Sequence, residues 1–213
     1  AFHSGHRVGE FLVMCRAVEP GAFGLHAVTG RGRHVHVEVE HFRRLQPGVA
    51  DVVRVADPGH RAALDGAALD ASGGTTVNVD FNTIYLNATS TGALFGSAAI
   101  NASTTPTLTM RSNIFVNLST PTGAGETVAY RRTTATLTTY GAASNGNLFY
   151  AGTPSAVNLI FTDTVTDHST LAGYKGLVAP RDANSVSENP PFMNTSGFAG
   201  DFLHIFSNVA TQV

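Results

Sequence analysis

Short apolar segments bounded by Asn or Gly recur along the chain from residue 75 onward, and each is followed by a polar turn. Residues 81–87 (FNTIYLN), 111–117 (RSNIFVN) and 145–150 (NGNLFY) share this pattern at intervals of 30 and then 34 residues. A weaker echo, Asn-Leu-Ile-Phe, follows at residues 158–161. Repeats of this length are typical of stacked architectures, in which each unit buries its apolar face on its neighbours.

The segments between these echoes are predicted to be further strands, because they are β-branched or alternate in polarity and are separated by turns. Two or three short strands per repeat match one turn of a parallel β-helix, where equivalent residues stack at about 4.8 Å. Asn at matching corners fits this fold, since its amide bonds to like residues above and below and it tolerates a left-handed backbone. A β-sandwich is the competing all-β architecture, but it does not require the repeated motif. The predicted strands cover residues 75–80, 98–101, 107–110, 127–131 and 134–139.

We therefore predict an all-β fold, a right-handed parallel β-helix (solenoid), over residues 72–213. Its last patterned segments are residues 189–192, as the entry to a final coil, and residues 201–205, as the strand of that coil. The stretch at about 162–190 departs from the coil pattern and is predicted to form a lateral loop or a short helix. A solenoid that begins at Ser72 would have about four coils, and an uncapped first coil would expose core and strand edges, so self-association is expected.

The amino-acid composition changes sharply near Ala71, which implies separate origins for the two segments. Residues 1–71 contain no Asn, Lys, Ile or Tyr but hold eight Arg and seven of the nine His. Residues 72–213 contain thirteen Asn and twenty-four Thr, with only five Lys plus Arg. Three interpretations of the first segment remain open: a β-rich or mixed subdomain, an appendage without a core of its own, and translation of GC-rich DNA in a wrong frame. Under the first, strands are predicted at residues 10–18, 33–40 and 51–56 and a weak helix at residues 62–71.

Charge and cysteine content exclude several classes of protein. The 213 residues carry a net charge of −2 and only 13% of them are charged, so there is no electrostatic footprint for nucleic acid or an anionic membrane. The single cysteine, Cys15, excludes an intramolecular disulfide and a Cys/His zinc finger. The apolar stretch at residues 11–15 is far shorter than the roughly 20 residues of a membrane span. We therefore expect no nucleic-acid partner, no membrane span and no cofactor.

The second segment resembles a known group of proteins. Residues 82–87, 113–117, 171–175 and 187–192 together look like the carboxy-terminal coils of secreted bacterial right-handed parallel β-helix proteins, which are similar in fold to the pectate-lyase-like superfamily. The resemblance covers about residues 73–206 and implies a secreted or cell-surface protein. In enzymes of this fold that act on acidic polysaccharides, acidic residues hold calcium beside an Arg or Lys that takes a proton. Because such solenoids also include hydrolases, epimerases, adhesins and stalks, the resemblance says more about fold than about activity.

Charged residues of the second segment cluster in the predicted lateral loop. Asp163, Asp167, Lys175 and Arg181 supply carboxylates for a hard cation and bases for proton abstraction. They are the catalytic candidates under a lyase or hydrolase interpretation, and calcium is expected as a cofactor only under that interpretation. Because loops collect charge without needing a function, a structural role is the leading interpretation of this cluster.

Two further motifs carry candidate chemistry. Arg131 and Arg132 lie in a predicted strand, so one side chain faces in and one out, or the pair lies at a corner. One interpretation is that the pair contacts a phosphate or a uronate. The favoured interpretation is that the pair is exposed and prevents another strand from pairing with the edge of the sheet. In a second motif, His and Glu alternate with apolar residues along a predicted strand, so their side chains lie on one face. They are interpreted either as ligands of a transition metal or simply as the polar face of that strand. Its members are His34, His36, Glu38 and Glu40.

Low charge, the lack of a compact acid–base constellation and the lack of a cofactor motif favour a non-catalytic function. We predict an extracellular or cell-surface β-helix segment that binds carbohydrate or another surface, or that serves as a stalk. Its expected partner is a polysaccharide or a cell-surface glycan. The alternative is a polysaccharide lyase or glycoside hydrolase fragment that acts on acidic polysaccharide. A flat Thr array that binds ice or mineral is a third class, but no regular Thr-x-Thr recurs in successive coils.

Overall fold

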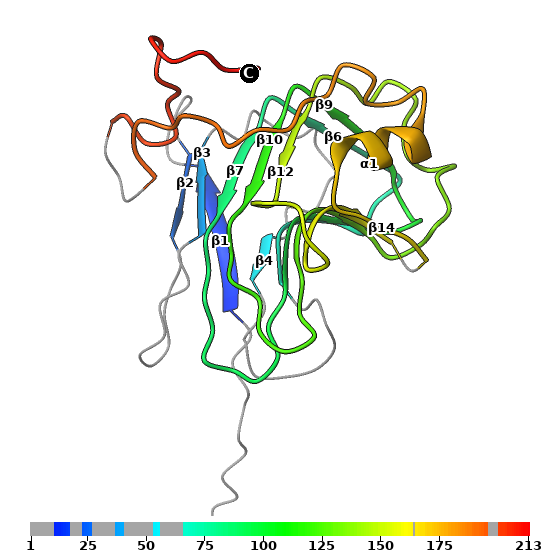
Figure 1. The fold of residues 1–213 in the computed structure, drawn as a ribbon, viewed down its shortest axis with the longest axis horizontal. Helices are drawn as coiled ribbons and strands as arrows, with labels where there is room; N and C mark the ends of the chain where they lie inside the picture. The colour runs from blue at the N-terminus through cyan, green and yellow to red at the C-terminus, as the bar shows by residue number, and fades with distance from the viewer. Residues whose placement is uncertain are drawn as a thin grey trace, which may run out of the picture.

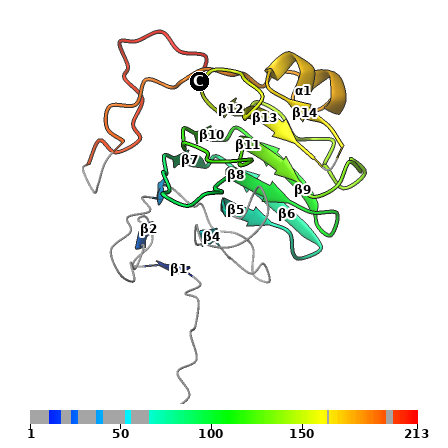
Figure 2. The same ribbon diagram turned by 60° about the horizontal axis from the view of Figure 1, so that its bottom comes forward.

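The computed structural model describes residues 67–163, 165–195 and 200–213 in full, and the backbone of Gly66 and of four strands nearer the amino terminus. In this part of the chain the fold is a parallel β-solenoid of about three turns, seen from two sides in Figures 1 and 2. The predicted all-β parallel β-helix is therefore confirmed. The four strands nearer the amino terminus are β1 (Phe11–Ala17), β2 (Phe23–His26), β3 (Val37–Glu40) and β4 (Val53–Val55).

The largest sheet has five strands in the order β14-β13-β11-β8-β5. Its strands pair in parallel from β5 to β13, and β14 adds to the far edge in antiparallel orientation. The register aligns Leu69, Ile100, Tyr130 and Phe161, which are all buried and form an inward-facing row. The strands are β5 (Gly66–Ala71), β8 (Ser97–Ala102), β11 (Thr127–Arg132), β13 (Asn158–Thr162) and β14 (Asp167–His168).

Two shorter sheets complete each turn. In one, β6 pairs in parallel with β9; in the other, the order is β12-β10-β7-β3, with β3 antiparallel to β7. The third turn continues the β6–β9 sheet only through isolated bridges from Tyr140 to Leu108 and from Asn145 to Arg111. The strands are β6 (Thr76–Asp80), β9 (Thr107–Arg111), β7 (Thr83–Leu86), β10 (Ile114–Asn117) and β12 (Leu148–Tyr150).

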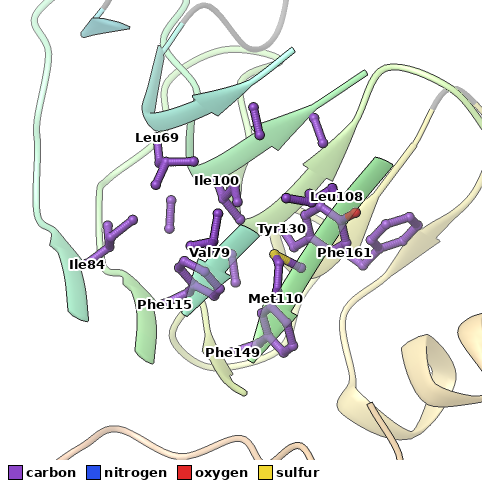
Figure 3. Packing of buried hydrophobic residues seen from close by; sticks show 14 of the residues in the cluster. Leu69, Val79, Ile84, Ile100, Leu108, Met110, Phe115, Tyr130, Phe149 and Phe161 are labelled. Carbon is purple, nitrogen blue, oxygen red and sulfur yellow. The ribbon is translucent and has the colours of Figure 1, made fainter. Parts of the chain in front are cut away.

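Apolar side chains from all three sheets point into the solenoid and pack in layers (Figure 3). Rings stack between turns, as Phe115 and Phe149 do at a centroid distance of 5.6 Å. Tyr130 lies at the centre of the aromatic cluster. Its ring contacts four other rings at centroid distances of 5.3–6.2 Å, and the nearest is Phe161 at 5.3 Å. The layered core follows from the register, because in-register stacking places like residues on like residues.

A lateral excursion follows β13. It contains β14 and the helix α1 (Leu171–Val178), in the segment predicted to form a lateral loop or short helix. Thr170 caps the helix by accepting from the backbone N–H of Gly173 at 3.3 Å, and Tyr174 and Val178 are buried in the core. No helix in the described part of the chain has the length and apolar composition needed to cross a membrane.

After the excursion, the chain returns to the third sheet and then runs back along the solenoid. Val186 bridges to Leu148, and Phe192 packs edge-on against Tyr85 of the first turn at 5.9 Å. In Figure 1 this returning segment is orange and passes β12 and β10 toward β7. The predicted final strand at residues 201–205 is wrong, because Phe202 and Ile205 make only isolated bridges within this returning segment.

Three other predictions of local structure are corrected. Residues 134–139 do not form a strand, because the carbonyl oxygen of Thr136 accepts from the buried Arg132 instead of from a neighbouring turn. The weak helix at residues 62–71 is wrong from Gly66 onward, where β5 pairs with β8. The echo at residues 158–161 belongs to β13 and pairs with β11, so it is not equivalent to the segments in β7, β10 and β12.

The predicted strands of the first segment overlap three of the four strands found there. The strands β1, β3 and β4 lie inside the predicted ranges 10–18, 33–40 and 51–56, and β2 was not predicted. The strand β1 pairs with β2 and β4 in antiparallel orientation. The remaining predicted residues of this segment lie outside the described residues.

Candidate functional site

A row of polar residues crosses the outer face of the largest sheet, and we call it the transverse polar row. Each member is the direct register partner of the next, on successive strands from β5 to β14. Direct register partners point to the same side of a sheet. Because Tyr130 and Arg132 are buried inside the solenoid, Arg131 between them points outward. The members of the row are Asp70, Asn101, Arg131, Thr162 and Asp167.

Hydrogen bonds join neighbouring members at both ends of the row. At one end, Asn101 donates through Nδ2 to Asp70 Oδ1 at 3.1 Å. At the other end, Thr162 donates through Oγ1 to Asp167 Oδ1. The Oδ1 atom of Asn101 is buried and has no hydrogen-bond partner among the described residues. The row therefore holds a buried acceptor between Asp70 and Arg131 that has no partner among the described residues.

Glu126 belongs to the same electrostatic environment. This residue directly precedes β11 and is half-buried. Burial raises the pKa of Glu126, the negative charge of Asp167 raises it further, and the positive charge of Arg131 opposes both effects. Glu126 thus holds its proton more readily than usual. Acid–base pairs in enzymes use this kind of asymmetry.

No hydrogen bond or ion pair joins any two of the four catalytic candidates from the sequence in the described ranges. Asp163 accepts from two backbone N–H groups of its own turn, at 2.6 and 2.7 Å. Lys175 donates to a backbone carbonyl at 3.0 Å, and Arg181 donates to three backbone carbonyls, the nearest at 2.7 Å. Asp167 is the one candidate that belongs to the transverse polar row.

The two adjacent arginines point to opposite sides of the sheet. This matches the prediction that one side chain faces in and the other faces out. Arg131 lies in the transverse polar row. Arg132 is 1% exposed and donates to the hydroxyl of Tyr130 at 2.9 Å and to the carbonyl of Thr136 at 3.0 Å. The favoured interpretation, an exposed pair that guards a strand edge, is therefore wrong for Arg132.

The alternating His and Glu motif is described only in part. Glu38 and Glu40 lie in β3, while His34 and His36 lie outside the described residues. Among the residues that the structure does describe, no three His, Cys, Asp or Glu side chains gather as the ligands of a metal ion would.

Three asparagines stack at the corner between the two shorter sheets, as the sequence predicted. Asn113 Oδ1 accepts from the backbone N–H and from Nδ2 of Asn82, at 2.9 and 3.2 Å. Asn147 Oδ1 accepts from the same two groups of Asn113, at 3.1 and 2.9 Å. The left-handed residue of each corner is the one before the Asn, which corrects the expectation that the Asn itself takes this conformation. These residues are Phe81, Ser112 and Gly146, with φ of 59°, 53° and 67°.

A buried network around Asp182 ends the ladder, and the sequence did not reveal it. Asp182 is fully buried, and its Oδ1 accepts from Asn147 Nδ2 at 2.9 Å and from Ser185 Oγ at 2.6 Å. Its Oδ2 accepts from the hydroxyls of Tyr140 and Tyr174. An enclosed carboxylate whose two oxygens are both occupied by protein donors indicates a structural role.

The buried tyrosines should make the fold sensitive to alkali. Burial raises the pKa of Tyr130 to about 12, and burial together with the charge of Asp182 raises the pKa of Tyr140 and Tyr174 well above the usual value. The folded state thus holds neutral phenols where the unfolded chain, with tyrosine pKa near 10, ionises. The stability they contribute is complete below about pH 10 and is lost as pH rises toward 12, by up to about 1.4 kcal/mol per pH unit for each tyrosine.

Absorbance at 295 nm and circular dichroism, followed together from pH 8 to pH 12.5, check this prediction. The double variant Tyr85→Phe and Tyr150→Phe leaves only the three buried tyrosines, since the chain has five. In that variant, ionisation and loss of secondary structure should coincide. Ionisation of these tyrosines with the fold intact would contradict the prediction.

The transverse polar row does leave a signal in the sequence. Asp70, Asn101, Arg131 and Thr162 follow one another at intervals of 31, 30 and 31 residues, the period of the solenoid. A search for charged residues that cluster along the chain misses this signal, because each member lies in a different turn. Asp167 cannot be found by this period, since it pairs with Thr162 through the antiparallel strand β14.

Comparisons with protein-family models, with curated proteins and with solved structures find no match to this chain. The resemblance to parallel β-helix proteins is therefore supported by the architecture of the chain itself, at the level of the solenoid fold.

Proposed function

We propose that this chain is a non-catalytic carbohydrate-binding β-solenoid that acts outside the cell or at its surface. The observation that carries the proposal is the transverse polar row, which places five polar side chains in register across one sheet face. Neighbouring positions in such a row are about 4.8 Å apart. A polysaccharide is itself a linear repeat of hydroxyl groups, so a linear repeat of donors and acceptors suits it.

The charges of the row favour a neutral glycan over the acidic polysaccharide expected under the lyase or hydrolase alternative. Asp70, Asp167 and the nearby Glu126 are acidic, and Arg131 is the basic member. Carboxylates repel uronates, whereas they accept hydrogen bonds from sugar hydroxyls.

Retention of the full chain on immobilised neutral and acidic polysaccharides tests this proposal. We expect retention on a neutral polymer, and we expect Asn101→Ala and Asp167→Ala each to weaken binding about fivefold to tenfold, the effect of one lost hydrogen bond. Asn78→Ala is the matched control, because Asn78 is exposed on β6, in a different sheet. No retention on any polymer, or equal losses in the control, would contradict the proposal.

A glycoside hydrolase is the second candidate, and the environment of Glu126 is the observation that favours it. A carboxyl with a raised pKa beside a second carboxylate matches the general acid and its partner in such enzymes. New reducing ends, measured in the same incubations, would reveal this activity. Cleavage that is lost in Glu126→Gln and kept in Lys175→Ala would make Glu126, beside the row, a catalytic residue. Cleavage that is lost in Lys175→Ala or Arg181→Ala would instead support the cluster predicted from the sequence.

A further inference from the structure

The corner of the third turn differs from the corners of the first two turns in its backbone hydrogen bonds. In the first turn, the backbone N–H of Phe81 donates to the carbonyl oxygen of Arg111 at 3.0 Å. In the second, the backbone N–H of Ser112 donates to the carbonyl oxygen of Asn145 at 3.2 Å. The equivalent N–H of the third turn, that of Gly146, donates among the described residues only to the side chain of Asn145, at 2.9 Å. The peptide nitrogen after Asn145 therefore lies outside the hydrogen bonds that join the turns.

The side-chain amide of Asn145 is held through its oxygen and not through its nitrogen. Its Oδ1 accepts from the backbone N–H of Gly146 at 2.9 Å and from that of Asn184 at 2.8 Å. Its Nδ2 makes no hydrogen bond to a described residue, whereas the Nδ2 of Asn147 in the ladder donates to Asp182 and to a backbone carbonyl, both at 2.9 Å. Gly146 is exposed and Asn145 is half-buried, so water reaches this amide.

We propose that Asn145 and Gly146 form a site of spontaneous deamidation, at which Asn145 becomes a carboxylate. Hydroxide removes the proton from the backbone nitrogen of Gly146, and this nitrogen attacks Cγ of Asn145. The new C–N bond closes a cyclic imide while Nδ2 takes a proton from water and leaves as ammonia. Water then opens the imide. Cleavage of the bond to Cγ gives aspartate, and cleavage of the bond to the backbone carbonyl carbon gives isoaspartate.

The fold supplies what this reaction needs. The hydrogen bond from Gly146 keeps the attacking nitrogen beside the amide, and glycine has no Cβ to obstruct the approach. The N–H of Asn184 points at the oxygen on which negative charge develops during the attack, as the donors of an oxyanion hole do. Nδ2 departs without breaking a hydrogen bond to a described residue. Asn145 is also the one asparagine in the chain that a glycine follows.

The product is a carboxylate beside Arg111. Asn145 and Asp80 are the register partners of Arg111 on its two sides, so the three side chains point to the same side. Asp80 already accepts from two nitrogens of Arg111, at 3.0 and 2.6 Å. A carboxylate in place of the amide keeps the oxygen that accepts from Asn184. Deamidation therefore adds one negative charge to this face, opposite an existing positive charge, and leaves the fold in place.

Peptide mapping by mass spectrometry tests the proposal on the full chain, incubated at 37 °C and at pH 7, 8 and 9. We expect Asn145 to lose ammonia at least about tenfold faster than any other asparagine, since the others lack this geometry. The rate should rise about tenfold per pH unit, because the attacking nitrogen must lose its proton. A peptide of residues 141–150 lacks Asn184 and should react about fivefold to tenfold more slowly than the folded chain, the effect of one hydrogen bond.

Variants separate the site from its surroundings. Gly146→Ser should slow the reaction about tenfold by obstructing the attack. It should fold, because Ser112 has the same conformation at the preceding corner and a Cβ at Gly146 would lie 3.7 Å from its nearest neighbour. Asn145→Asp reproduces the product and should keep the circular dichroism spectrum and urea midpoint of the parent chain. Asn147→Asp is the matched control, and its midpoint should fall because its carboxylate would face Asp182.

The mapping of the parent chain needs no substitution, so it decides the matter even if a variant fails to fold. Faster loss of ammonia at another asparagine, a rate that does not change with pH, or a peptide that reacts as fast as the folded chain would each overturn the proposal. Unfolding of Asn145→Asp under conditions where the parent chain is folded would overturn it as well.

Discussion

Replacing Asp182 by Ala should lower the free energy of unfolding by about 4 kcal/mol, because the change leaves several buried donors without an acceptor. The hydroxyls of Tyr140 and Tyr174 and the amide of Asn147 all donate to this carboxylate, and none of these residues is more than 1% exposed. One of the two hydroxyls can donate to the other, since they lie 3.1 Å apart, but water cannot reach the remaining donors without opening the core. Urea unfolding followed by circular dichroism measures the loss.

The control is Asp201→Ala. Asp201 is half-buried and accepts a 3.3 Å hydrogen bond from Asn194, so its removal should cost less than about 1 kcal/mol. Asp182→Asn separates charge from shape, because an amide keeps one acceptor oxygen and turns a second group into a donor that faces other donors. We expect it to lie between the parent chain and Asp182→Ala. A loss at Asp182 no larger than that at Asp201 would show that the network does not hold this end of the solenoid together.

Tyr130→Ala should destabilise the chain by about 4 kcal/mol, through a cavity at the centre of the core. Tyr130 is 0% exposed, and its ring contacts Tyr140, Phe149, Phe161 and Tyr174 at centroid distances of 5.3–6.2 Å. These partners come from different turns and from α1, so they cannot collapse together into the space that the ring leaves. Urea unfolding again gives the magnitude, and a lower temperature of unfolding should accompany it.

Tyr130→Phe separates the ring from its hydroxyl. It keeps the packing and removes only the acceptor for the guanidinium of Arg132, so we expect a loss of about 2 kcal/mol. Val165→Ala is the surface control, since Val165 is 74% exposed and should change stability by less than about 0.5 kcal/mol. If Tyr130→Phe cost as much as Tyr130→Ala, the hydroxyl and not the ring would be the main contribution.

Periodicity made the solenoid predictable. Stacking in register requires a residue of similar chemistry at the same place in each turn, so the apolar segments in β7, β10 and β12 and the corners at Asn82, Asn113 and Asn147 repeat visibly in the sequence. The same reasoning fails where one turn departs from the pattern. Residues 134–139 have the composition of a strand, but the buried Arg132 takes the carbonyl of Thr136.

The candidate site was less predictable from the sequence. In a solenoid, residues at equivalent positions of neighbouring turns lie side by side even though they are far apart along the chain. Asp163, Lys175 and Arg181 are near one another in sequence, and each has separate backbone partners. Asp70 and Asp167, far apart in sequence, belong to one row because register pairing across five strands connects them.

The sequence by itself determined the all-β class, the solenoid period and the ladder of asparagines, since each depends on a pattern that every turn must repeat. Only the tertiary structure decided that Arg132 points into the core, that Asp167 joins the row through β14, and that Asp182 closes the ladder. These features occur once in the chain. They depend on contacts between particular turns, and a contact made once leaves no period in the sequence.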